Sequence, residues 1–119
     1  MVTLSLVFHG ILIDFDAFFV STWRHKDSGN KYFRLSGRRA ESSCSIYTLM
    51  NFRIDGSFED AFDESLSVCD MLNYLLSLKY DGHSESEALQ MTAVLYPDHF
   101  KYLDVLGFQP SSQEGGEKS

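Results

Sequence analysis

Two aspartates near the start of the chain, Asp14 and Asp16, come nearest to a catalytic spacing. They follow an apolar run and flank a single residue, so both carboxylates could approach one hard cation such as Mg²⁺. Such a pair, joined by further acids, would serve a metal-dependent phosphoryl-transfer or nucleotide-handling enzyme, which is our first alternative. Residues two apart on a β-strand share a face in any case, and here alternation places both acids on the solvent side. We therefore expect no metal and no cofactor at this position.

The stretch around these two acids, residues 11–21, resembles the first palm strand of the Y-family DNA polymerases, where an Asp-x-Asp-Ala-Phe-Phe run holds magnesium. The Asp-x-Asp after an apolar strand is also similar to the motif of haloacid dehalogenase phosphatases. The first resemblance implies several hundred residues and a later Ser-x-Asp-Glu strand, and the second implies a following Gly-Thr, a later lysine and a second acidic pair. This 119-residue chain completes neither pattern, so we predict a protein that is not an enzyme.

Histidine and cysteine do not complete a site either. The histidines have no short metal-binding spacing and no neighbouring cysteine. Cys44 and Cys69 lack the paired spacing of a zinc or redox site, and two small buried thiols fit a reduced, cytoplasmic protein. The four histidines are His9, His25, His83 and His99.

Charge is segregated along the chain. Residues 1–54 carry seven basic and four acidic side chains, a net charge of +3, whereas residues 55–119 carry three basic and thirteen acidic side chains, a net charge of −10. The net charge of −7 for the whole chain disfavours nucleic acid as a partner, because phosphate would be repelled. A large acidic surplus instead favours rapid capture of a basic protein surface.

This balance predicts a small acidic inhibitor that binds and neutralises a partner protein with a basic surface, such as a nucleic-acid-handling enzyme. In size, charge and lack of catalytic motifs it is similar to bacterial immunity proteins and phage anti-defence proteins. The apolar start, residues 1–13, lacks a basic leader and is too short to span a membrane. We expect a cytoplasmic protein, in a bacterial cell or a phage-infected host, without membrane contact.

Two surfaces are candidates for the partner contact. The first is an acidic helix start, whose acids exceed what a helix dipole needs. The second is a basic hairpin with interleaved aromatic residues, which could also stack bases as a nucleic-acid-binding module, our second alternative, or act as a solvated edge that deters aggregation. The candidate partner-binding residues are Glu59, Asp63, Glu64 and Asp70 on the helix and Trp23, Tyr32 and Phe33 on the hairpin.

The elements that position these residues change in kind near residue 55. Before it, alternating apolar residues predict an antiparallel meander of about four or five strands. Breaks fall at Gly10, at residues 27–30 as a hairpin turn, and at residues 36–39 as a second turn, and a last strand covers residues 44–54.

After residue 55, apolar residues recur at helical spacing. Ser57 starts a long helix that ends near Lys79, Ser84 starts a second that stops before Pro97, and a third covers residues 98–106. The predicted fold is α+β, with the meander packed against one long and two shorter C-terminal helices. Residues 1–110 form one domain and residues 111–119 a flexible polar tail. The stripe expected to be buried on the long helix is Phe58, Phe62, Leu66, Cys69, Leu72 and Leu76.

Overall fold

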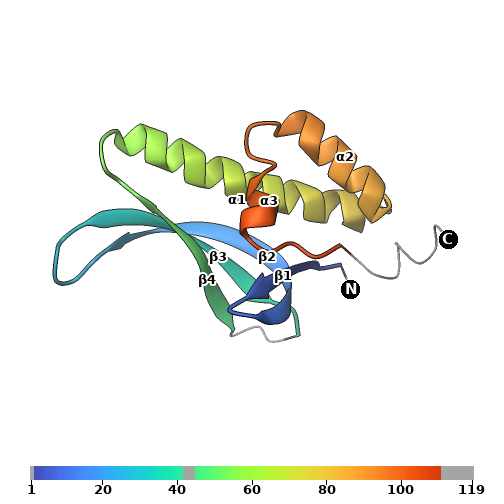
Figure 1. The fold of residues 1–119 in the computed structure, drawn as a ribbon, viewed down its shortest axis with the longest axis horizontal. Helices are drawn as coiled ribbons and strands as arrows, with labels where there is room; N and C mark the ends of the chain where they lie inside the picture. The colour runs from blue at the N-terminus through green and yellow to red at the C-terminus, as the bar shows by residue number, and fades with distance from the viewer. Residues whose placement is uncertain (1, 42–44, 111–119) are drawn as a thin grey trace.

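An antiparallel sheet is followed by three helices, which confirms the predicted α+β fold (Figure 1). The computed structural model describes residues 2–41 and 45–110, so Cys44 and the predicted tail lie outside the described residues. The sheet has the order β1-β2-β3-β4, and every neighbouring pair is antiparallel. The elements are β1 (Leu4–Phe8), β2 (Ile11–Arg24), β3 (Lys31–Arg39), β4 (Ile46–Arg53), α1 (Phe58–Tyr80), α2 (Glu85–Leu95) and α3 (Tyr102–Val105).

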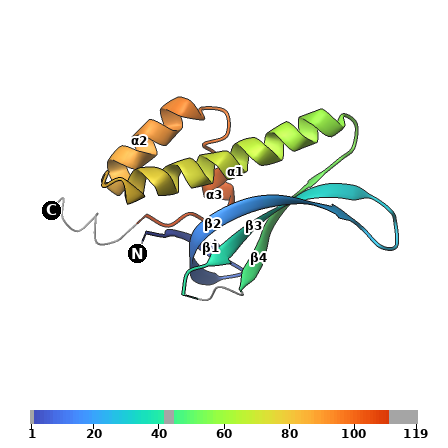
Figure 2. The same cartoon turned by 180° about the vertical axis from the view of Figure 1, so that it is seen from behind.

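The helices cover only one face of the sheet. Figures 1 and 2 both show α1 lying along that face, with α2 against α1 and the opposite face of the sheet uncovered. The hairpin of β2 and β3 extends past the first turn of α1 (Figure 1). Within the described residues, no helix is both long and apolar enough to span a membrane. Fully buried core residues include Leu4, Leu6, Phe15 and Leu35 from the sheet and Val68, Met71, Leu72 and Leu75 from α1.

The predicted helix starts are confirmed by their caps. The Ser57 hydroxyl accepts a hydrogen bond from the backbone N–H of Asp60 at 3.2 Å, and the Ser84 hydroxyl accepts one from Glu87 at 3.1 Å. The third helix is shorter than predicted, because the backbone N–H groups of residues 99 and 102 bond three residues back and form tight turns before α3 begins. Gly107 follows α3 with a φ of +79°, as a left-handed helix end requires.

The predicted turn at residues 36–39 is wrong, because these residues lie inside β3. Gly37 pairs with Phe18 on β2 and with Tyr47 on β4. A Cβ atom on Gly37 would stand 2.7 Å from Cδ1 of Phe15, so the glycine leaves room for the Phe15 ring. Close packing, not a turn, explains this glycine.

The predicted apolar stripe of α1 is only partly buried. Leu72 is fully buried, whereas Phe58, Phe62 and Leu66 are 55%, 39% and 37% exposed. The rings of Phe58 and Phe62 contact Phe33 of β3 at centroid distances of 5.2 and 5.5 Å, but the fully buried residues of α1 begin only at Ser65. Three large apolar side chains therefore remain at the surface near the start of α1.

Candidate partner-binding surfaces

Asp14 and Asp16 are each held by a neighbouring strand. The Ser5 hydroxyl donates a hydrogen bond to Oδ1 of Asp14 at 2.5 Å, and Nε of Arg38 donates one to Oδ1 of Asp16 at 2.9 Å. A β-bulge between Phe15 and Ala17 falls on Asp16 and breaks the alternation that the sequence predicts to be regular. No group of three His, Cys, Asp or Glu side chains among residues 2–41 and 45–110 could hold a metal ion. Within the described part of the chain, no third potential metal ligand therefore joins this pair.

The only free thiol in the described part of the chain is that of Cys69, which is buried. Burial raises the pKa of the Cys69 thiol to about 11, and the charge of Asp70 adds to the rise. The thiolate is the nucleophilic form, so at neutral pH little of this thiol is in its reactive form. Its role is packing, as its place on the apolar stripe predicts.

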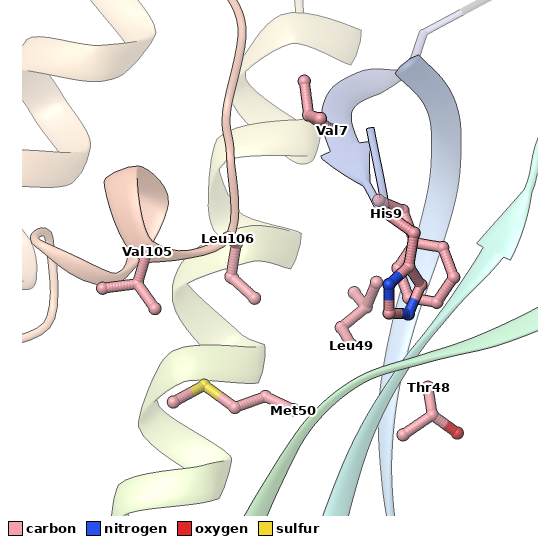
Figure 3. A pocket seen from close by; sticks show the side chains of 8 residues that line it. Val7, His9, Thr48, Leu49, Met50, Val105 and Leu106 are labelled. Carbon is pink, nitrogen blue, oxygen red and sulfur yellow. The ribbon is translucent and has the colours of Figure 1, made fainter. Parts of the chain in front are cut away.

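A hollow of about 240 Å³ lies between the end of β1, the middle of β4 and α3 (Figure 3). Its one titratable side chain is His9, whose ring packs edge-on against Phe8 at a centroid distance of 4.3 Å. The other polar side chain in the lining is the hydroxyl of Thr48, and the lining contains no acidic residue to pair with the imidazole. The hollow is lined by Val7, Phe8, His9, Thr48, Leu49, Met50, Val105 and Leu106.

Three acids of α1, Glu59, Asp63 and Asp70, form an exposed row that we call the acidic flank. Their spacing of four and seven residues places them on one side of the helix. No basic side chain of the described chain lies within ion-pair distance of any of them. The acidic flank is thus a row of three carboxylates whose charge is not neutralised within the described structure.

Glu64 differs from these three acids, although the sequence groups them together. Its Oε2 accepts a hydrogen bond from the Tyr102 hydroxyl at 2.6 Å, and its Oε1 lies 3.0 Å from Nε2 of His99. The hydrogen bond from Tyr102 is the main reason that the pKa of Glu64 is lowered, and the same bond raises the pKa of Tyr102 to about 12. Glu64 therefore ties α1 to α3 within the fold.

The hairpin residues divide between the two faces of the sheet. On the uncovered face, Trp23 pairs in register with Tyr32, and the Arg34 guanidinium lies 4.0 Å from the centre of the Trp23 ring. Nη2 of Arg34 also donates a hydrogen bond to the Tyr32 hydroxyl at 2.9 Å. Phe33 points the opposite way, because neighbouring residues of a strand alternate, and it is only 2% exposed. Phe33 therefore packs in the core and is not part of the exposed hairpin surface.

Asn73 is a key residue that the sequence did not reveal. Its side-chain amide hydrogen-bonds both backbone groups of Phe18, with Nδ2 donating to the Phe18 oxygen at 2.9 Å and Oδ1 accepting from the Phe18 N–H at 3.2 Å. The available signal was a polar amide one turn after Cys69 and next to Leu72 in the apolar stripe. The Asn73 amide thus takes the place of a neighbouring strand at Phe18, because β1 pairs with β2 only as far as Phe15.

The two charge blocks of the sequence become the two layers of the molecule. The sheet belongs to the basic block, and residues 55–110 contain eleven acidic and two basic side chains, a net charge of −9. A partner approaching the helices from the side of the acidic flank therefore meets a negative surface.

No protein-family model, no curated protein and no solved structure matches this chain. Its function has therefore to be inferred from its own geometry and charge.

Proposed function

We propose that this protein is a small inhibitor whose acidic flank binds a basic surface of another protein and neutralises that protein. The acidic flank carries the proposal, because Glu59, Asp63 and Asp70 are exposed and have no ion-pair partner among the described residues. Asp63 and Asp70 lie beyond the first turn, where the helix dipole does not stabilise them, and like charges on one helix side repel one another slightly, so these two acids add nothing to folding. A cationic partner surface would remove that repulsion on binding.

The chemistry of the partner follows from the charge of this surface. A row of carboxylates within a layer of net charge −9 attracts a basic surface and speeds its encounter. Nucleic-acid-handling enzymes carry such surfaces, since they hold phosphate with Lys and Arg. The proposed setting is the cytoplasm of a bacterial cell or of a phage-infected host, and the mode of action is occlusion of that basic surface.

Affinity capture from a lysate of the source host tests the proposal. The bait is the wild-type chain, the double variant Asp63→Lys/Asp70→Lys, or the control Asp98→Lys/Asp104→Lys, which changes net charge equally on the segment after α2. We expect the wild type and the control to capture the same basic protein and the acidic-flank variant to lose it. Equal capture by all three baits would overturn the proposal. The captured protein's activity, assayed with and without added wild-type chain, then tests inhibition.

A second candidate function rests on the uncovered face of the sheet. Trp23, Tyr32 and Arg34 form a stacked aromatic and cationic group there, of the kind that holds single-stranded nucleic acid. Trp23 is the only tryptophan, so its fluorescence reports directly on this surface. Quenching on titration with a single-stranded oligonucleotide, abolished by Arg34→Gln, would favour this candidate. Unchanged fluorescence would exclude it.

A further inference from the structure

Half of β2 has a free edge. β1 pairs only with residues 11–15 of β2, and no other described strand pairs with residues 17–24 on the side away from β3. The backbone groups of Phe18 point to this edge, because both are bound by Asn73. Backbone groups of a strand alternate in direction, so those of Val20 and Thr22 point to the same edge. The N–H of His25 donates to the carbonyl of Asn30 across the hairpin. The backbone groups of odd-numbered residues therefore point toward β3, and those of even-numbered residues point toward the free edge.

Large apolar side chains flank this free edge on both sides. Residues three and four apart on a helix lie on one side, so the side of α1 that carries Asn73 also carries Leu66 and Phe62, two and three turns earlier. The surface of a globular protein seldom exposes several large apolar side chains beside one unpaired strand edge unless they bind something. The exposed residues concerned are Phe58, Phe62 and Leu66 on α1 and Phe19 and Trp23 on the uncovered face of the sheet.

A hollow of about 270 Å³ lies at the hairpin end of the free edge. Thr22 and Phe58 line it together with Trp23, Arg24 and Lys31. An added strand directs every second side chain toward one face of the sheet, so an apolar side chain of the segment can reach this hollow, whereas a basic one would meet Arg24 and Lys31. The hollow and the free edge thus suit an extended segment better than a helix.

The acidic flank lies beside the same edge. Glu59, Asp63 and Asp70 are within one turn or less of Phe62, Leu66 and Asn73 along α1, on the solvent side of that apolar row. A strand docked on β2 would therefore place one face of its side chains against Phe62 and Leu66, with the carboxylates of the acidic flank beyond them on the solvent side of α1. Apolar and basic side chains are complementary to such a surface.

We propose that the free edge of β2, at residues 19–24, binds an extended segment of the partner that is basic and apolar, as an added β-strand. This inference rests on the proposed function, because the acidic flank selects the basic partner. Asn73 occupies the edge at Phe18 and so ends the added strand there. The backbone hydrogen bonds supply binding energy, and the acidic flank supplies selectivity.

A second copy of this chain is a poorer occupant of the same edge. Antiparallel pairing of two β2 edges would set both α1 helices on one side of the joined sheet. Each acidic flank would then face the other, and like charges across an interface oppose association. A basic segment is attracted by the acidic flank, and the like charges that it meets are Arg24 and Lys31 at the hollow.

The test uses a short, end-blocked peptide in which lysine and valine alternate, observed through the backbone amide signals of the full chain by NMR. We expect shifts at Val20 and Thr22 and a measurable dissociation constant. The same peptide N-methylated at its two central residues, which removes one donor from each strand edge, should bind about tenfold more weakly. Thr22→Pro should weaken binding to a similar degree, whereas the control Thr22→Val keeps the N–H and should not. A peptide of alternating glutamate and valine should not bind.

Each other outcome would overturn one part of the proposal, either strand addition or the basic nature of the segment. Equal affinity for the N-methylated peptide, or no shift at the edge, would overturn strand addition and leave the acidic flank as a purely electrostatic contact. Equal binding of the glutamate peptide would overturn the basic occupant. Loss of partner capture by Asp63→Lys/Asp70→Lys is measured separately, so failure of the proposed function and failure of strand addition are distinguishable. The N-methylated peptide tests strand addition on the wild-type chain, so the test still works if Thr22→Pro does not fold.

Discussion

The side-chain amide of Asn73 pairs with the backbone of Phe18 in place of a neighbouring strand, through hydrogen bonds of 2.9 and 3.2 Å. A backbone N–H and carbonyl left unpaired in such a half-buried place cost about 1–3 kcal/mol. We therefore expect Asn73→Ala to lower the free energy of unfolding by about that amount, measured by urea denaturation. Ser77→Ala, one turn later and exposed, is the control and should stay within about 0.5 kcal/mol. An unchanged midpoint for Asn73→Ala would show that water replaces the amide without loss.

Leu72 and Phe62 separate folding from binding on the same helix. Leu72 is fully buried, so Leu72→Ala should cost about 2–5 kcal/mol through lost contacts and a cavity. Phe62 is 39% exposed, so Phe62→Ala should cost clearly less, about 1–2 kcal/mol, while weakening the binding of the lysine-valine peptide. Urea denaturation of both variants checks the order. Equal costs would mean that the first half of α1 is packed as tightly as the second.

The hydrogen bond between Glu64 and Tyr102 makes the free energy of unfolding depend on pH in the acidic range. The pKa of Glu64 is lowered in the fold, so its contribution is present above its ordinary value of 4.5 and is lost as pH falls through the lowered value. Solvent weakens the effect, because the Glu64 side chain is 40% exposed. Glu64→Gln removes the titration and keeps an acceptor for Tyr102. Between about pH 6 and about pH 3, the wild type should therefore lose more stability than this variant.

The control for that experiment is Asp63→Asn, an exposed neighbour on the same turn without a hydrogen-bond partner in the described structure. Its unfolding free energy should follow the wild-type curve against pH. Identical curves for wild type and Glu64→Gln would mean that the Tyr102 bond does not survive in solution.

Cys69 should resist thiol reagents in the folded protein. Its pKa is raised to about 11 by burial, so little thiolate exists near pH 8 and the sulfur is also shielded. In a Cys44→Ser background, a colorimetric thiol reagent should react at a rate set by unfolding and at full speed in denaturant. Fast modification of the native chain would place the sulfur at the surface.

The α+β class, the sheet-then-helix order and the helix caps could be predicted, because alternation, helical spacing and Ser57 or Ser84 are local signals. Gly37 misled the prediction, since glycine is typical of turns, yet here it is explained by the Phe15 ring across the sheet. Such a contact depends on strand register, which the local pattern does not contain.

The negative charge of the candidate surface could be predicted from the sequence, but not which of its acids remain exposed. Composition indicates an acidic helix, yet only the packing of α3 reveals that Glu64 is engaged by Tyr102 while Asp63 stays exposed. In the same way, the free edge of β2 follows from the short β1 and from Asn73, which lies 55 residues from Phe18 in the chain. Long-range contacts of this kind decide which polar residues remain for a partner.

The association rate of the wild-type chain with its captured partner, measured against ionic strength, tests the central claim most directly. Raising salt from about 0.01 M to about 1 M shortens the screening length from about 30 Å to about 3 Å. If the acidic flank captures a basic surface, the rate should fall roughly ten- to thousandfold over this range, and Asp63→Lys/Asp70→Lys should be slow and nearly insensitive to salt. A wild-type rate that is independent of salt and equal to that of the variant would contradict the account.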